Sequence, residues 1–449
     1  MRELIDAIKQ ATPDNPLSVR LNGAELMDRW GGNTQDESFE LMQQAVDAGA
    51  DMISVTVGWQ EAPESSFGRD VSPGYWNFLS EKAKKMFPNT LIAFGNRLPD
   101  PAMANDCVRD GIFDYWEVCR PLLADPEMIH KAMDDRMEEV RPCIGSLNCL
   151  SRLFRDLPYT CTMNPMLGHE VEPEYHVTEA TEKKRVMVIG AGPAGMEAAI
   201  TARKRGHSVT VFDKGDKIGG NLFAYAENDL ARPADLHDVI KYYGVMAKKL
   251  GVEVRLNTEA NAKFMRSVLH EYDACIVAAG ARTDMESFKY MPGHELLIDA
   301  LDVAHGKKKV GKRVVMIGGG MIGLTISERL QKDGHELTVV EKEKRVGGDI
   351  MPTFKWRHTA WVDELGIKTV CSAELVKVTA EGATVKSAKG GEQFIPCDNV
   401  IVSSPRRANH DLFYEFQWMI DELHGGGDAT VPRGLDAAIQ EGYKLGVRI

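Results

Sequence analysis

The sequence predicts an α/β protein in which part of a (β/α)8 barrel is followed by two dinucleotide-binding units. Over the first 140 residues, strands alternate with helices at the spacing of parallel βα units. Two glycine-rich loops, which begin at Gly190 and Gly318, each lie between a buried strand and a helix. Residues 143–161 contain three cysteines and separate the barrel part from the first loop.

The composition of the 449 residues is that of a globular protein with two to four domains. The net charge of −12 argues against nucleic acid and acidic membranes as partners, because both require clustered Lys and Arg. No apolar run approaches the roughly 20 residues that span a bilayer. The first residues lack the apolar centre of a signal peptide, and with eight cysteines we expect a cytoplasmic protein.

The first 140 residues contain four predicted strands and no glycine-rich dinucleotide loop. This combination favours part of a barrel over an open sheet. The predicted strands are residues 17–21, 52–57, 91–94 and 115–119, and the predicted helices between them are residues 37–48, 76–86 and 101–110.

Two arginines, Arg97 and Arg120, follow the third and fourth of these strands. In a barrel they would occupy the loops after the last two strands, which form the usual phosphate site of this fold. Backbone amides and an arginine fork would hold the phosphate of a mononucleotide there. Two solvated surface arginines are the alternative.

The cysteines at positions 143, 149 and 161 are spaced as metal ligands more than as disulfide partners. An iron–sulfur cluster between two nucleotide sites would relay single electrons. Ser146 stands where a fourth thiolate is expected. A serine hydroxyl is far less acidic than a thiol, so we expect an altered cluster. Three structural cysteines are the alternative.

The first glycine-rich loop has the residues that a dinucleotide requires. Gly190 permits the tight turn, Gly192 lets a pyrophosphate approach the helix, and Gly195 allows the helix to pack closely on the strand. Asp213, at the end of the next strand, can accept hydrogen bonds from a ribose. Further candidate contacts are Pro193, Ala194, Gly220 and Asn221.

The second loop repeats this design with Gly318, Gly320 and Gly323. Glu341 again lies twenty-three residues past the first glycine. Far downstream, Gly426-Gly427-Asp428 is expected to open a terminal helix that includes residues 437–444.

Several motifs resemble the old yellow enzyme superfamily, in the multidomain branch that contains 2,4-dienoyl-CoA reductase, enoate reductases and trimethylamine dehydrogenase. Val19-Arg20-Leu21 matches the strand whose arginine faces the flavin in that family. Gly58-Trp59-Gln60-Glu61 resembles the Gly-Trp-His-Glu of its reductases, which makes Gln60 the candidate catalytic residue. The three cysteines match the family's [4Fe–4S] ligands, with Ser146 in place of the second.

The resemblance implies the C-terminal half of the barrel, an FAD-binding Rossmann-like domain and an inserted NAD(P)-binding one. The implied ranges are 1–140 for the barrel, 141–184 for the cysteine segment and linker, 185–300 with 400–449 for FAD, and 301–399 for NAD(P)H. The implied contacts are Arg20, Arg97 and Arg120 for FMN, the first loop with Asp428 for FAD, and the second loop for NADH or NADPH.

Glu341 would repel a 2′-phosphate and so favours NADH. Lys342, Lys344 and Arg345 lie close by and weaken that preference. Gln60 departs from the family because a glutamine cannot deliver a proton near neutral pH. A half barrel would also leave strand edges unpaired, so we expect a partner chain or self-association to cover it.

The resulting hypothesis is an oxidoreductase that moves electrons from NADH through FAD and a cluster to FMN, and then to an unsaturated acid or acyl-CoA. Three alternatives stay open. The chain could be an electron-input subunit without its own substrate site, a methylated-amine dehydrogenase or demethylase, or a degenerate copy.

Overall fold

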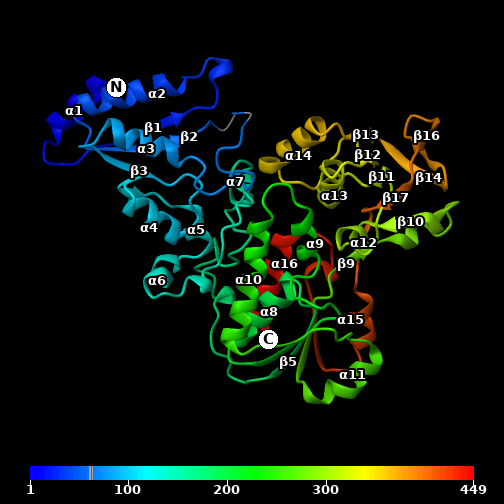
Figure 1. Ribbon diagram of the computed structural model, residues 1–449. Helices are drawn as coiled ribbons and strands as arrows, with labels where there is room; N and C mark the ends of the chain where they lie inside the picture. Colours follow the sequence, from blue (N-terminus) through cyan, green and yellow to red (C-terminus); the bar gives the residue numbers. More distant parts are fainter. Residues whose placement is uncertain (60–61, 63) are drawn as a thin grey trace. The chain divides into compact units, whose positions relative to one another are not determined.

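The computed structural model describes residues 1–59, 62 and 64–449, so the predicted catalytic residue Gln60 and its neighbour Glu61 lie outside the described residues. The chain divides into two compact units, Met1–Gly145 and Ser146–Ile449 (Figure 1). The division falls inside the cysteine segment. None of the described helices combines the length and the apolar composition that crossing a bilayer would require.

The first unit is built on a four-stranded parallel sheet in the order β1-β2-β3-β4. Two of its helices begin at side-chain caps: Thr34 and Glu37 form a capping box at α2, and the Asp100 side chain accepts from the Ala102 N–H at α4. The elements are α1 (Arg2–Ala11), β1 (Ser18–Ala24), α2 (Gln35–Asp47), β2 (Met52–Val57), α3 (Asn77–Met86), β3 (Leu91–Phe94), α4 (Pro101–Arg109), β4 (Tyr115–Trp116), α5 (Arg120–Ala124) and α6 (Met128–Met133).

The two faces of this sheet differ in chemistry. One face packs with the helices in an apolar core around Phe39, Ile53 and Leu79, all of them almost fully buried. The other face carries polar side chains, including Ser54, whose hydroxyl donates to Glu117 at 2.9 Å. The fourth strand is shorter than residues 115–119 because its neighbour β3 ends at Phe94, which pairs with Trp116.

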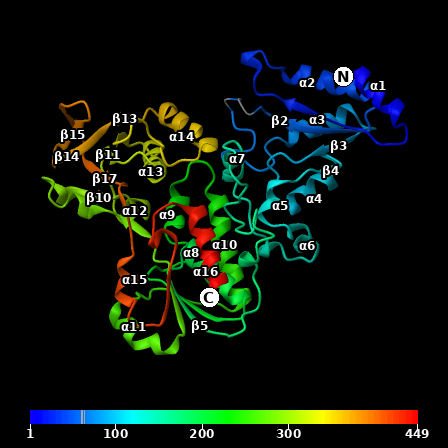
Figure 2. The same ribbon diagram turned by 180° about the vertical axis from the view of Figure 1, so that it is seen from behind.

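The second unit contains two parallel five-stranded sheets. The first sheet has the order β19-β8-β5-β6-β7, and the second has the order β10-β17-β11-β12-β13. Figure 2 shows strands β10, β11, β13 and β17 of the second sheet. Around the first sheet lie α7 (Asn148–Leu153), β5 (Arg185–Ile189), α8 (Pro193–Lys204), β6 (Ser208–Phe212), α9 (Asn221–Asn228), α10 (Pro233–Leu250), β7 (Glu253–Arg255), α11 (Ala262–Val268), β8 (Ala274–Val277), α15 (Asp411–Phe416), β19 (Glu422–Gly425) and α16 (Leu435–Arg448).

The second sheet belongs to an insertion between β8 and β19. The chain enters and leaves it through β9 and β18, which pair as antiparallel strands. A three-stranded antiparallel sheet, β14-β15-β16, packs beside it. The elements are β9 (Ala281–Thr283), β10 (Leu297–Asp299), α12 (Ala300–Ala304), β11 (Arg313–Ile317), α13 (Met321–Lys332), β12 (Glu336–Glu341), α14 (Pro352–Glu364), β13 (Lys368–Cys371), β14 (Ala373–Thr379), β15 (Gly382–Ser387), β16 (Glu392–Pro396), β17 (Asn399–Val402) and β18 (Arg406–Ala408).

The terminal helix α16 lies directly against α8, the helix of the first glycine-rich loop (Figure 1). The close approach needs glycine: a Cβ at Gly442 would lie 2.2 Å from the carbonyl oxygen of Ala194. The helix does not open at Gly426-Gly427-Asp428, as the sequence predicts. A short 3-10 turn, Gly427–Ala429, stands there instead, and α16 starts at Leu435.

Candidate functional site

The first glycine-rich loop is closed by hydrogen bonds to the strand that follows it. The Gly190 N–H donates to the Phe212 carbonyl at 2.8 Å. The Asp213 carboxylate accepts from the Ala191 N–H and from the Gly215 N–H, both at 2.6 Å. Asp213 is thereby fixed at the edge of the loop, where its remaining lone pairs can accept from a ribose.

The glycines of this loop have the space that their expected roles require. A Cβ at Gly192 would meet no described atom within 4 Å, so the backbone there is open to a ligand. A Cβ at Gly195 would lie 1.9 Å from the Gly190 carbonyl oxygen, so only glycine permits this packing. Pro193 and Ala194 begin α8, whose positive end faces the open position. These residues fit the pyrophosphate of FAD.

Two further segments reach the same loop. The Gly219 N–H donates to the Ala191 carbonyl at 2.8 Å, and a Cβ at Gly220 would lie 3.2 Å from the Gly192 Cα. From the C-terminal part, a Cβ at Gly427 would lie 2.7 Å from the Ala194 Cβ. Residues more than 200 positions apart in the sequence therefore build one site.

Asn221 and Arg406 converge on one carbonyl oxygen beside this loop. The Asn221 amide donates to the Ala281 carbonyl at 3.2 Å, and Arg406 Nη2 donates to it at 2.9 Å. Burial lowers the pKa of Arg406, although the charges of Asp428 and Asp299 oppose this shift. The result is a half-buried cation that interacts electrostatically with the predicted flavin contact Asp428.

The second loop reproduces the first, hydrogen bond for hydrogen bond. The Gly318 N–H donates to the Val340 carbonyl at 2.9 Å. The Glu341 carboxylate accepts from the Gly319 N–H at 2.6 Å and from the Glu343 N–H at 2.8 Å. A Cβ at Gly323 would lie 2.0 Å from the Gly318 carbonyl oxygen, as at Gly195 in the first loop. These residues fit a second dinucleotide.

The two loops differ at the second glycine. A Cβ at Gly320 would meet the carboxylate oxygens of Asp349 at 2.9 and 3.0 Å, whereas the space at Gly192 is open. The Asp349 carboxylate accepts a 2.9 Å hydrogen bond from the Met321 N–H, at the first turn of α13.

The cysteine segment is divided between the two units. Cys143 belongs to the first unit, and Cys149 and Cys161 belong to the second. All eight cysteines of the chain are described, and none forms a disulfide. Among the described residues, no three or more His, Cys, Asp or Glu side chains gather as metal ligands. The Ser146 hydroxyl forms a 3.0 Å hydrogen bond with the Thr162 hydroxyl. Ser146 therefore presents a hydroxyl bonded to Thr162 where a four-cysteine cluster requires a thiolate.

In the second unit, this segment contacts one helix beside each of the two five-stranded sheets. Gln440, on α16, donates to the Cys161 carbonyl at 3.3 Å. Thr353, on α14 of the insertion, donates to the Leu147 carbonyl at 3.2 Å. Residues 147–161 therefore link the two nucleotide-binding domains.

In the first unit, Arg97 and Arg120 are held by one loop. Arg97 is buried and donates through Nε to the Val71 carbonyl at 2.7 Å, while Arg120 donates to the Phe67 carbonyl at 3.1 Å. Arg20 lies on β1 with 68% of its side chain exposed, 3.7 Å from the Glu117 carboxylate.

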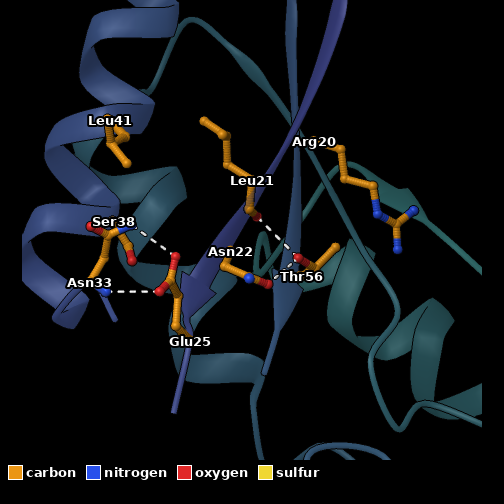
Figure 3. Close-up of a pocket in the computed structure, with 8 residues that line it drawn as sticks. All are labelled: Arg20, Leu21, Asn22, Glu25, Asn33, Ser38, Leu41 and Thr56. Atoms are coloured by element: carbon orange, nitrogen blue, oxygen red, sulfur yellow. Dashed lines mark hydrogen bonds between the residues drawn. The ribbon is translucent and has the colours of Figure 1, made fainter. Parts of the chain in front are cut away.

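A pocket of about 340 Å³ lies along the open edge of β1, between that strand and α2 (Figure 3). Thr56 donates to the Asn22 side chain at 2.5 Å, and Glu25 accepts two 2.8 Å hydrogen bonds from Asn33. The other residues that line the pocket are Arg20, Leu21, Ser38 and Leu41.

Comparisons with known proteins support the two loops. Residues 184–426 match the model of the pyridine nucleotide-disulphide oxidoreductase family, a span that includes both. The solved structure of a 2-naphthoyl-CoA reductase complex superposes with a TM-score of 0.93 and 32% identity, over 100% of this chain and 67% of that one. This chain belongs to the pyridine nucleotide-disulphide oxidoreductase family. Within it, the chain falls in the old yellow enzyme-like NADH:flavin branch.

Two curated relatives are similar over nearly the whole chain. A metal reductase of Desulforamulus reducens is 29% identical over 99% of this chain and 70% of its own length. A cinnamate reductase of Clostridium sporogenes is 29% identical over 100% of this chain and 68% of its own length. This chain thus spans about two thirds of the length of its relatives. Membership makes it an oxidoreductase of the NAD(P)H flavoprotein class, with FAD and NAD(P)H as cofactors.

Two residues of this family member were missed by the sequence reasoning. Arg406 lies in a short strand with no motif around it, and nothing in the sequence indicates its contact with the loop. Asp349 had a signal: every landmark of the first loop recurs 128 residues later, from Gly190 and Gly318 to Asn221 and Asp349. The Gly-Gly pairs that directly precede Asn221 and Asp349 are part of that repeat.

Proposed function

We propose that this oxidoreductase takes two electrons from NADH and uses them to reduce a carbon–carbon double bond of an unsaturated acid or acyl-CoA. The balance is NADH, one proton and the double bond in, and NAD⁺ with the saturated bond out. The proposal rests on one observation above all: two matched dinucleotide loops in one unit, each with an acid in place for a ribose.

FAD, when bound to the first loop, would supply the conversion between hydride transfer and single-electron transfer. The protein's own contribution is to position it. Gly192 admits the pyrophosphate to the end of α8, Asp213 orients the ribose, and Arg406 supplies a half-buried positive charge that interacts electrostatically with Asp428. A cation next to a flavin favours the anionic reduced form, which makes electron acceptance easier.

The substrate class is supported by the first unit. Its sheet has a polar face with the exposed Arg20, the partly exposed Glu117 and the buried Ser54, which suits a charged or polar ligand more than a packed barrel core. Arg97 and Arg120, held by one loop after neighbouring strands, suit the phosphate of FMN. The names of the similar reductases add that cinnamate and 2-naphthoyl-CoA are handled by related proteins.

We propose that the four parallel strands are the C-terminal half of a (β/α)8 barrel and that further βα units pair with β1. Among the described residues, β1 pairs on one edge only, with β2. A seven-residue strand with an open edge is a template for another strand. The pocket beside it, between β1 and α2, would receive side chains of the added unit. Size measurement of the purified protein tests this: only a monomeric chain without any bound polypeptide contradicts it.

An electron-input role is the second candidate, and the cysteine segment favours it. Because Ser146 presents a hydroxyl bonded to Thr162 in place of a thiolate, no electron step is assigned to a cluster. We propose that residues 143–161 hold an altered iron–sulfur site or none. Iron and sulfide analysis of anaerobically purified protein and of the Ser146→Cys variant tests this. A rise in iron in the variant supports the altered site, and near-zero iron in both leaves the cysteines structural.

The test of the main proposal uses Gly192. Because the space at Gly192 is open, a Gly192→Val variant should fold normally while its side chain blocks the pyrophosphate. We expect wild-type protein to be purified with FAD and to show NADH-dependent bleaching of the flavin without oxygen. The variant should lack FAD and should melt like wild-type protein from which FAD has been removed, because bound FAD itself stabilises the fold. Flavin content without NADH-dependent bleaching would refute NADH as the donor, and FAD without FMN would favour the electron-input role.

A further inference from the structure

Asp349 occupies the place in the second loop where a dinucleotide's pyrophosphate would approach. Its carboxylate accepts from the Met321 N–H at 2.9 Å, and its oxygens lie 2.9 and 3.0 Å from the Cβ position of Gly320. Gly320 corresponds to Gly192, where no described atom lies within 4 Å of that position. The anion-binding end of α13 therefore already holds an anion from its own chain.

The matched residue of the first loop behaves differently. The Gly-Gly turns of the two loops donate equivalent hydrogen bonds, from Gly219 to Ala191 at 2.8 Å and from Gly347 to Gly319 at 2.7 Å. The residue directly after the Gly-Gly pair of the first loop is Asn221, which is uncharged. Its side chain donates to the Ala281 carbonyl at 3.2 Å, away from the helix end. The corresponding residue of the second loop is Asp349. The two sites thus share a frame and differ by one charge.

The backbone after each turn explains why Asp349 reaches the helix end. In the first loop, α9 starts at Asn221 itself, and the helix carries that side chain with it. In the second loop, the next helix starts at Pro352, a residue that fits the first position of a helix. Residue 349 therefore lies outside the helix, and its carboxylate turns toward the first N–H of α13.

We propose that Asp349 lowers the affinity of the second nucleotide-binding domain for nucleotides that contain a pyrophosphate, by competing with that group for the end of α13. Asp349 must move aside, or tolerate a second anion beside it, whenever a pyrophosphate binds. It thus weakens binding of NADH, NADPH and ADP alike, and it does not affect adenosine, which has no phosphate. This proposal rests on the proposed role of the second loop as the NADH site.

Glu341 and Asp349 then act on different parts of the bound nucleotide. Glu341, fixed by two backbone amides, faces the ribose and discriminates against a 2′-phosphate. Asp349 acts on the pyrophosphate, which every dinucleotide has. A loosely held pyridine nucleotide would exchange rapidly, so that NAD⁺ leaves before the next NADH arrives.

The test is nucleotide binding to the full-length chain by titration calorimetry, with NADH, ADP and adenosine as probes. Asp349→Asn keeps the size of the side chain and an oxygen acceptor for Met321, and it copies the residue of the first loop. We expect about tenfold tighter binding of NADH and ADP, or ~1.4 kcal/mol, with adenosine unchanged. The matched control is Asp333→Asn, which removes the same charge at the opposite end of α13.

The outcomes separate this proposal from the proposed function. Equal NADH affinity in wild type and Asp349→Asn overturns the role of Asp349 and leaves the NADH site standing. Tighter ADP and NADH binding in the variant, without flavin reduction by NADH, supports Asp349 and refutes NADH as the donor. No binding of any nucleotide to either protein overturns both. A melting temperature equal to that of the wild type checks that the variant is folded.

Discussion

Replacement of Gly442 by alanine probes how tightly α16 is held against the first nucleotide loop. A Cβ at this position would lie 2.2 Å from the carbonyl oxygen of Ala194 and 3.0 Å from its Cα. Both atoms belong to the backbone of α8, so no side-chain rotation can relieve the overlap. We therefore expect α16 to move away from α8 by about 1 Å, which restores an ordinary van der Waals distance.

The expected loss of stability follows from two opposing effects. An extra methyl group in a packed interior costs about 1–3 kcal/mol, and contact with rigid backbone places Gly442 near the upper end of that range. Alanine in a helix interior regains about 1 kcal/mol relative to glycine. The net loss of about 2 kcal/mol should lower the Tm by roughly 4–8 °C.

Thermal unfolding followed by circular dichroism measures this loss, and FAD titration measures its effect on the site. FAD should bind more weakly because Gly427, just before α16, packs on the same Ala194. The control is Gly244→Ala in α10, whose new Cβ would meet only a terminal methyl of Ile218 at 3.2 Å. That variant should be as stable as the wild type or more so. A G442A protein with unchanged Tm and FAD affinity would refute the reasoning.

Three other variants or modifications test single side chains. Burial raises the pKa of the Cys275 thiol to about 12. Iodoacetamide at pH 8 should therefore label the exposed Cys119 in the native protein and leave Cys275 unmodified. Labelled Cys275 in mass spectrometry would contradict this. Burial also raises the pKa of Glu328, which hydrogen-bonds to His358 at 2.8 Å. Because the pKa of this carboxyl is raised in the folded state, the wild-type protein loses stability as the pH rises past the ordinary value of 4.5. Urea unfolding should therefore show that the stability of Glu328→Gln increases relative to the wild type between pH 4 and pH 7. A difference that stays constant over this range would contradict the prediction. Arg406→Met removes the half-buried cation that interacts with Asp428 and should weaken FAD binding about tenfold, or ~1.4 kcal/mol, in a fluorescence titration. An unchanged affinity would argue that Arg406 does not act on the flavin.

The sequence predicted the parts of the site that depend on backbone geometry. The roles expected of Gly192 and Gly195 match the open space and the close packing found at those positions, because such roles follow from the absence of a Cβ. The strands at residues 52–57 and 91–94 are confirmed, since each is bounded by turn residues and is apolar enough to be buried.

Side-chain contacts between distant segments could not be predicted in this way. The sequence shows that Ser146 replaces a cysteine but gives no sign that Thr162 is its partner. The reach of Asp349 to α13 depends on where the next helix starts, three residues further on. Arg406 joins the first loop only because the chain returns from the insertion beside β9.

The pairing of strands β9 and β18 also affects the folding of the whole second unit. They hold together the two ends of an insertion of about 120 residues. If the insertion is folded, the flexible loop between β8 and β19 shortens from residues 278–421 to residues 278–280 and 409–421. This is about three doublings of loop length, which saves roughly 2 kcal/mol of chain entropy. Local melting of the insertion would release this restraint, so a heated or destabilised nucleotide domain would also loosen the neighbouring flavin site.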